Sequence, residues 1–147
     1  MTSETKPLAP RERVVILDYG SQYTQLIARR IRELQVYAEI VPWYAQESQV
    51  MALAPKGLVL SGGPNSVYDS QSPTLPDYVV HSGIPVLGIC YGMQLLAQVL
   101  GGRVVAGTER EYGPARVQLA EPAAELWAGL STEQSVWMSH GDRIEEV

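Results

Sequence analysis

The segment Pro85–Gly102 constrains the fold more than any other part of this chain. Pro85–Ile89 is a short apolar run bounded by turn residues, which is typical of a buried parallel strand. From there, apolar residues recur at helical spacing until Gly101–Gly102 provides a left-handed stop, and they are Met93, Leu96, Ala97 and Leu100. The segment therefore predicts a strand, a sharp turn and a helix. The only cysteine of the chain, Cys90, lies at the turn.

The residues around Cys90 have the form Gly88-x-Cys90-x-Gly92, which is that of a nucleophile elbow. Such a turn lifts one side chain above the sheet, and it needs flanking glycines because a Cβ atom would clash there. The free amides of the following helix favour a thiolate, and the Tyr91 N–H is placed to hold an oxyanion. A lone cysteine is more often a small buried hydrophobic residue. The two glycines and the strand–helix frame favour the nucleophile.

A second motif follows another predicted strand, Gly57–Leu60. The chain continues directly into the glycine-rich loop Ser61–Ser66, at the carboxyl end of that strand, where open α/β sheets bind their ligands. The adjacent Gly62 and Gly63 let the backbone turn its amides toward a ligand. Gly-Gly-Pro is by itself an ordinary turn. Together with the elbow on the next strand, it becomes a candidate second oxyanion donor.

The first part of the chain reads as a βαβ unit. Val14–Leu17 and Val36–Val41 are predicted strands joined by a helix, and a parallel return needs such a crossover. We therefore expect an α/β fold, a three-layer, doubly wound and mostly parallel sheet with helices on both faces. Residues 1–13 are expected to form a disordered tail, and residues 14–147 the domain.

After Gly102 the pattern changes to short alternating runs between Arg103 and Leu119, which predict several short strands in a β-ribbon. Ser135–Met138 is a further predicted strand. It is expected to end in a polar loop, Ser139–Asp142.

Composition restricts the functional classes. One cysteine excludes a disulfide framework and suits a reducing cytosol, so we expect a cytoplasmic protein. There is no apolar run long enough to span a membrane. The net charge of −5 argues against nucleic acid as a partner, because such binding depends on clustered Lys and Arg. We therefore expect neither nucleic acid nor a membrane as a partner, and we also expect no metal site.

Five motifs occur together in the chain: Asp18–Tyr23, Ser61–Pro64, Gly88–Gln94, Arg110–Gly113 and Trp137–Asp142. In this order they resemble the class I glutamine amidotransferases. The elbow and the Gly-Gly-Pro loop are shared by the whole family. The first, fourth and fifth motifs are similar to its GMP synthase branch.

The resemblance implies hydrolysis of L-glutamine through a thioester on Cys90. Backbone amides at Gly63 and Tyr91 are then the oxyanion donors. Gly62 and Gln94 are implied to hold the substrate, together with Ser139 and His140. The ammonia is implied to pass to an ATP-pyrophosphatase domain, which uses ATP and Mg²⁺ to convert XMP to GMP. No cofactor is implied for the domain seen here, and the full-length enzyme is implied to be a homodimer.

The sequence also departs from the family. The family completes its triad with the histidine and glutamate of a downstream His-Pro-Glu segment, and no such segment occurs in the 147 residues. We therefore expect a domain that lacks its C-terminal part and is nearly inactive alone, since loss of the base costs orders of magnitude in rate. A second hypothesis makes His140 the general base, because it follows a predicted strand on the same rim as the elbow.

Two other interpretations stay open. In the first, the chain is the amidotransferase subunit of another synthase. In the second, it is a non-catalytic amidotransferase-like module that docks on a synthetase. Asp18–Gln22 and Arg110–Gly113 argue against the first, and the missing His-Pro-Glu segment suits the second.

Overall fold

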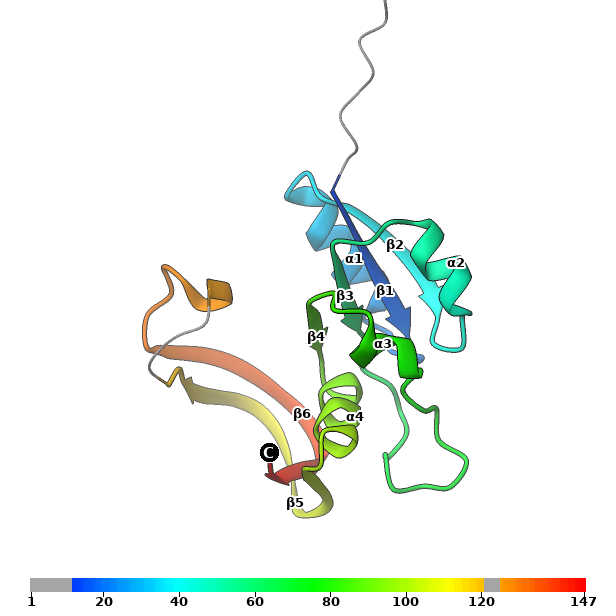
Figure 1. Ribbon diagram of the computed structural model, residues 1–147. Coiled ribbons are helices and arrows are strands. Elements are labelled where there is room, and N and C mark those ends of the chain that lie inside the picture. The colour runs from blue at the N-terminus through cyan, green and yellow to red at the C-terminus, as the bar shows by residue number, and fades with distance from the viewer. Residues whose placement is uncertain (1–11, 121–124) are drawn as a thin grey trace, which may run out of the picture. The chain divides into compact units, whose positions relative to one another are not determined.

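The computed structural model describes residues 12–120 and 125–147 of the chain. These residues form two compact units (Figure 1). The first unit comprises residues 12–104 and 144–147, and the second comprises residues 105–143. Most of the expected tail lies outside the described residues, but Arg13 already belongs to the first strand.

The first unit is built on a parallel sheet. Its described strands lie in the order β2-β1-β3-β4, and they are β1 (Arg13–Asp18), β2 (Tyr37–Pro42), β3 (Gly57–Leu60) and β4 (Val86–Gly88). Ile16 of β1 lies opposite Ile40 of β2 and Val59 of β3. Each strand is rich in β-branched or other apolar residues, as expected of strands that are covered on both faces.

Helices cover both faces of this sheet. They are α1 (Thr24–Glu33), α2 (Glu47–Ala52), α3 (Asp77–His81) and α4 (Tyr91–Val99). Ala28 of α1 packs with Ile16 and Val59 on one face. The larger core cluster, on the other face, joins Val15 and Leu17 to buried residues of the remaining helices, namely Val50, Tyr78, Val79, Tyr91 and Leu95. The predicted three-layer α/β architecture is confirmed.

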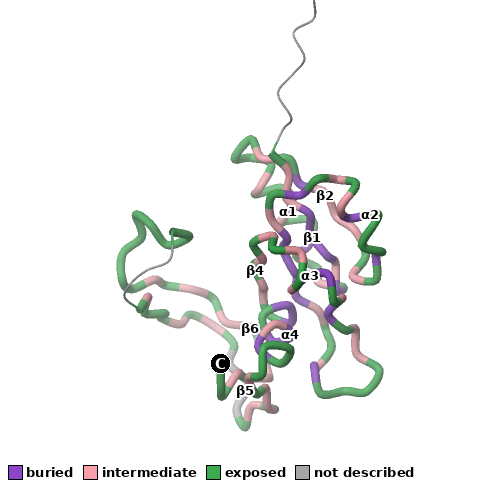
Figure 2. The backbone as a smooth tube through the Cα atoms, in the orientation of Figure 1, coloured by how far each residue is buried: buried purple, intermediate pink, exposed green. Residues whose placement is uncertain are grey.

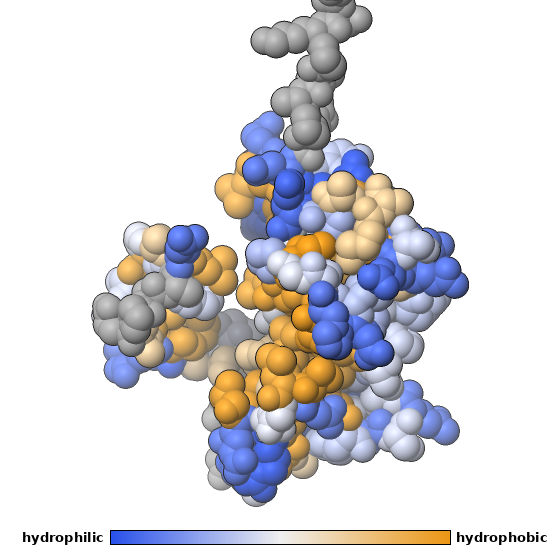
Figure 3. Space-filling view, in the orientation of Figure 1, coloured by the Kyte–Doolittle hydropathy of each residue, from blue (hydrophilic) through white to orange (hydrophobic). Residues whose placement is uncertain are grey.

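Helix α4 buries only part of the apolar stripe seen in the sequence. Ala97 is buried and Leu96 packs against the core, but Met93 and Leu100 are 47% and 73% exposed. Gln94 and Leu95 are buried as well. At the start of the helix, Gly92 lies directly against Leu60 of β3. Figure 3 shows a hydrophobic area at the surface over β4 and α4.

The second unit is a two-stranded ribbon made by the central parts of β5 (Arg103–Gln118) and β6 (Glu133–Glu146), which run in opposite directions in Figure 1. A short 3₁₀ turn, η1 (Glu125–Trp127), lies between them. The predicted ribbon is found, but as two long strands. The predicted polar loop at Ser139–Asp142 is wrong, because these residues continue β6. They belong to the strand that forms a sheet with β5, and strand formation depends more on such context than on residue type.

Candidate active site

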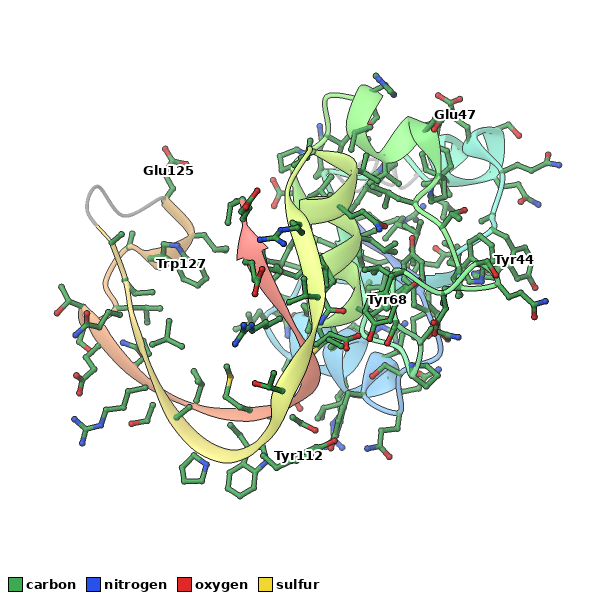
Figure 4. The ribbon with its side chains drawn as sticks, turned by 90° about the horizontal axis from the view of Figure 1, so that it is seen from below. Tyr44, Glu47, Tyr68, Tyr112, Glu125 and Trp127 are labelled. Carbon is green, nitrogen blue, oxygen red and sulfur yellow. The ribbon has the colours of Figure 1, made fainter. Side chains whose placement is uncertain are left out.

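Three loops meet at the carboxyl edge of the parallel sheet. They follow β1, β3 and β4, whose carboxyl ends lie on the same side because the strands are parallel. The chain leaves β1 toward β2 on one side, and β3 lies on the other side, so the strand order reverses between β1 and β3. Open α/β sheets bind ligands at such a point. Figure 4 looks toward this edge, where Tyr68 marks the loop after β3.

Cys90 occupies a strained turn between β4 and α4. Its φ of 49° and ψ of −112° lie outside the regions that non-glycine residues prefer, and the residue is exposed. The flanking glycines are needed sterically. A Cβ atom on Gly88 would lie 2.7 Å from the backbone of Met93, and one on Gly92 would collide with Leu60. The backbone therefore has the geometry of a nucleophile elbow.

The glycine-rich loop lies directly beside this cysteine. A Cβ atom added to Gly62 would be 3.3 Å from the Cβ of Cys90 and 3.6 Å from the Oγ of Ser21. A Cβ atom on Gly63 would lie 2.5 Å from the carbonyl oxygen of Tyr19. Only glycine fits at Gly63 without movement of the backbone. The loops after β1 and β3 thus pack together next to the exposed cysteine.

Two backbone donors at this edge have no acceptor in the described part of the chain. They are the N–H groups of Gly63 and Tyr91. The neighbouring N–H of Gly92, in contrast, donates to the carbonyl oxygens of Ser61 and Ile89, at 3.1 and 3.0 Å. An unpaired N–H beside a nucleophile is available to a developing negative charge.

Gln94 lies on the first turn of α4 and is only 6% exposed. Its backbone N–H donates to the carbonyl oxygen of Cys90 at 3.1 Å. No described residue forms a hydrogen bond with its side-chain amide. A largely buried side chain whose amide keeps no described partner is able to bind a polar ligand.

Tyrosine hydroxyls anchor the long loop after β3. Tyr91 donates to the carbonyl oxygen of Pro73 at 2.5 Å, and Tyr19 donates to that of Thr74 at 3.2 Å. Burial raises the pKa of both hydroxyls above the ordinary value. They therefore stay protonated at neutral pH and act as donors. The two rings also contact each other, with centroids 5.5 Å apart. The same pair of tyrosines therefore contacts both the elbow and this loop.

Ser139 and His140 lie in the second unit, on β6. They were predicted to contact the substrate, and His140 was alternatively predicted to be the base. The structure describes each unit by itself, so these roles stay predictions. The residues that it brings together around Cys90 are Gly62, Gly63, Tyr91 and Gln94.

Sequence reasoning gave no role to Ser61. This residue is fully buried at the end of β3 and is hydrogen-bonded to both Tyr19 and Gly62. Its position immediately before a glycine pair at a strand end was the available signal. In residues 12–120 and 125–147, no group of three or more His, Cys, Asp or Glu side chains is arranged to hold a metal ion. Across the same residues, no helix combines the length and apolar character needed to cross a membrane.

Known proteins with similar sequences were found over almost the whole chain. A glutamine-hydrolysing GMP synthase of Thermomicrobium roseum is 56% identical over 147 residues, which cover 99% of this chain and 28% of the relative. The corresponding enzyme of Vibrio atlanticus is 54% identical over 136 residues, covering 92% of this chain and 26% of the relative. The chain thus spans little more than a quarter of these relatives.

Two solved structures have a fold similar to that of this chain. A candidate GMP synthase subunit of Thermoplasma acidophilum matches with a TM-score of 0.75 and 29% identity, over 92% of this chain and 67% of that one. A glutamine amidotransferase of Thermotoga maritima has the same fold, with a TM-score of 0.68 and 21% identity over 92% of this chain and 63% of that one. The family model for glutamine amidotransferase class-I matches residues 15–147. The chain therefore belongs to the class-I glutamine amidotransferase family.

Proposed function

We propose that this chain is the glutamine-hydrolysing part of a GMP synthase. The identity of more than 50% to two glutamine-hydrolysing GMP synthases supports this branch of the family. The single observation that carries the chemistry is the exposed Cys90 on a strained elbow, with Gly62 packed against it. A thiol in this setting is able to attack the carbon of a primary amide.

In the proposed reaction, the thiolate of Cys90 forms a C–S bond to the side-chain amide carbon of glutamine. The electron pair of the carbonyl moves to its oxygen, which accepts hydrogen bonds from the N–H groups of Gly63 and Tyr91. The C–N bond then breaks, and the nitrogen takes up a proton and leaves as ammonia. Water hydrolyses the thioester and releases glutamate.

Binding of glutamine is assigned to Gly62, Gln94, Ser139 and His140. The largely buried Gln94 side chain, whose amide has no described partner, supports its part in this set. We propose that the domain itself uses no cofactor. ATP and Mg²⁺ are assigned to a synthetase domain that receives the ammonia and aminates XMP to GMP, in a cytoplasmic and homodimeric enzyme.

Labelling of Cys90 tests this function. The purified chain is treated with an electrophilic analogue of glutamine, and adducts are located by mass spectrometry. We expect saturable labelling of Cys90 that L-glutamine prevents and L-asparagine does not. Labelling no faster than that of a free thiol would contradict an activated elbow.

Turnover by the chain alone is expected to be very slow, because the sequence holds no His-Pro-Glu segment. Ammonia release from glutamine is the measurement, with Cys90→Ser as the control. Activity that is present and then lost in His140→Ala would instead make His140 the general base. Labelling without any ammonia release in any condition would favour the non-catalytic docking module.

A further inference from the structure

Ser61 connects the three loops of the candidate site. Its Oγ accepts a hydrogen bond from the N–H of Tyr19 and donates one to the carbonyl oxygen of Gly62, each at 2.9 Å. Its own carbonyl oxygen accepts the N–H of Gly92 at 3.1 Å. The side chain has no exposed surface. One residue therefore links the end of β1, the glycine-rich loop and the start of α4.

The hydroxyl of Ser61 fixes the orientation of one peptide group. A serine hydroxyl has a single hydrogen, and the Tyr19 N–H occupies a lone pair, so the hydrogen is directed to the carbonyl oxygen of Gly62. The peptide between Gly62 and Gly63 is planar and trans, so its N–H points opposite to its C=O. Because the C=O is held toward the buried hydroxyl, the N–H of Gly63 faces away from it.

This peptide needs such a constraint. Two adjacent glycines leave the backbone free to adopt either orientation of the peptide between them, because neither carries a Cβ atom. In the opposite orientation a carbonyl oxygen would stand where the N–H is, and it would repel a negative charge. The N–H of Gly63 has no acceptor among the described residues, and Gly62 lies against Cys90.

We propose that Ser61 is the positioning residue of the oxyanion site. Its hydroxyl selects the orientation in which the Gly63 N–H is free to bind the oxygen of the carbonyl that Cys90 attacks. Ser61 itself touches neither substrate nor reacting atoms. The inference rests on the proposed function, since it concerns the same site.

Two reagents with different demands test this role. A chloromethyl ketone analogue of glutamine presents a carbonyl, and Cys90 forms a C–S bond while chloride leaves. Methyl methanethiosulfonate contains no carbonyl, and Cys90 forms an S–S bond while methanesulfinate leaves. For each reagent, the inactivation constants are measured by mass spectrometry on the full 147-residue chain.

We expect Ser61→Ala to lower the maximal rate with the chloromethyl ketone about 100-fold, the size of effect that loss of one oxyanion donor has. The concentration for half-maximal rate and the methanethiosulfonate rate should change less than about twofold, because they do not depend on that donor. Ser61→Thr keeps the hydroxyl and should restore the rate. Ser82→Ala is the matched control, since it removes a part-buried hydroxyl that accepts a hydrogen bond from the N–H of Ile84, outside the three loops of the site.

If Ser61→Ala lowers the labelling rate equally with both reagents, or with neither, the proposed role of Ser61 is overturned. If the unchanged chain shows no saturable reaction with the ketone, the proposed function itself fails. A second measurement needs no variant. In ¹⁵N-labelled chain carrying the ketone adduct, the amide protons of Gly63 and Tyr91 should both shift downfield, and an unshifted Gly63 would overturn the inference.

Discussion

The two units of the chain are both built on strands, but they bury the side chains of those strands very differently. In the first unit, helices cover both faces of the sheet, and Val15, Ile16, Leu17 and Leu60 have no exposed surface. In the second unit, none of the described side chains is buried (Figure 2). Tyr112 and Trp137, from the two strands of the ribbon, are 64% and 75% exposed.

This difference indicates where stability and rigidity reside. A two-stranded sheet is marginal by itself, because each strand has one partner and no covering layer. A sheet between helix layers buries apolar area on both faces. Cys90, Gly62 and Ser61 all belong to the layered unit. The proposed nucleophile and oxyanion donors are thus held by the part of the chain that is best able to hold them still.

The largest effect is expected from shortening a core side chain. Leu60→Ala should lower the free energy of unfolding by about 2 to 5 kcal/mol, because it removes buried methyl groups and leaves a cavity. The matched change in the ribbon, Trp137→Ala, should cost less than about 0.5 kcal/mol, because that side chain is exposed. Urea titration followed by far-UV circular dichroism measures both. Similar decreases in the free energy of unfolding for the two variants would contradict the difference in burial between the units.

Adding one methyl group at the elbow should cost less than the core deletion. Gly92→Ala places a Cβ atom against the side chain and backbone of Leu60, so we expect a loss of about 1 to 3 kcal/mol and slower labelling of Cys90. Gly57→Ala is the control in the same unit, since its Cβ would meet its nearest neighbour at 3.8 Å. Urea midpoints and labelling rates are compared for both variants. A Gly92→Ala chain as stable and reactive as Gly57→Ala would show that the elbow is not close-packed.

Alkaline pH should destabilise the first unit through Tyr19. Burial, and then the neighbouring Tyr78 and Tyr91, raise its pKa above the ordinary value of 10. Above about pH 10 the unfolded chain loses this proton while the folded chain keeps it. The folded state then binds more protons, so the free energy of unfolding falls as pH rises, by up to about 1.4 kcal/mol per pH unit from this group.

Urea titrations between about pH 9 and about pH 11 test this dependence. Tyr19→Phe should show a shallower slope than the unchanged chain. The control is Tyr44→Phe, which removes a hydroxyl from a side chain that is 69% exposed. An equal slope in all three proteins would assign the alkaline loss to other groups.

The smallest effect concerns a cross-strand ion pair of the ribbon. Arg116 and Glu133 are 2.9 Å apart, and their side chains are 75% and 50% exposed. An exposed pair of this kind contributes between about 0.2 and 1 kcal/mol and is screened by salt. Glu133→Gln should therefore lower stability by no more than about 1 kcal/mol, with a smaller loss in high salt. A larger decrease in stability that salt does not reduce would mean that this ion pair is less exposed to solvent than the structure indicates.

Local patterns were sufficient for most of the fold. The four parallel strands were predicted because each is a short apolar run bounded by turn residues, and such runs have few alternatives in an α/β chain. The elbow was predicted because Gly88 and Gly92 flank Cys90, and the structure gives the steric reason in the backbone of Met93 and in Leu60.

The buried face of α4 and the course of β6 were not predictable from local pattern. Met93 and Leu100 are apolar at helical spacing, as core residues are, but they are exposed, whereas Ala97 on the same stripe is buried. Ser139–Asp142 has the composition of a loop, and only pairing with β5 keeps it in a strand. The hydrogen bond between Tyr19 and Ser61 likewise joins residues 42 positions apart, which no local pattern reveals.

The sequence by itself determined the class of fold, the place of the cysteine and the resemblance to one enzyme family, because these depend on residue types and on spacing within a segment. The tertiary structure decided which side of α4 is buried, which peptide groups remain free to donate, and that one buried hydroxyl orients the glycine loop. The physical reason is that hydrogen bonds and close packing between separate strands depend on three-dimensional distances, and a linear pattern records only the order of residues.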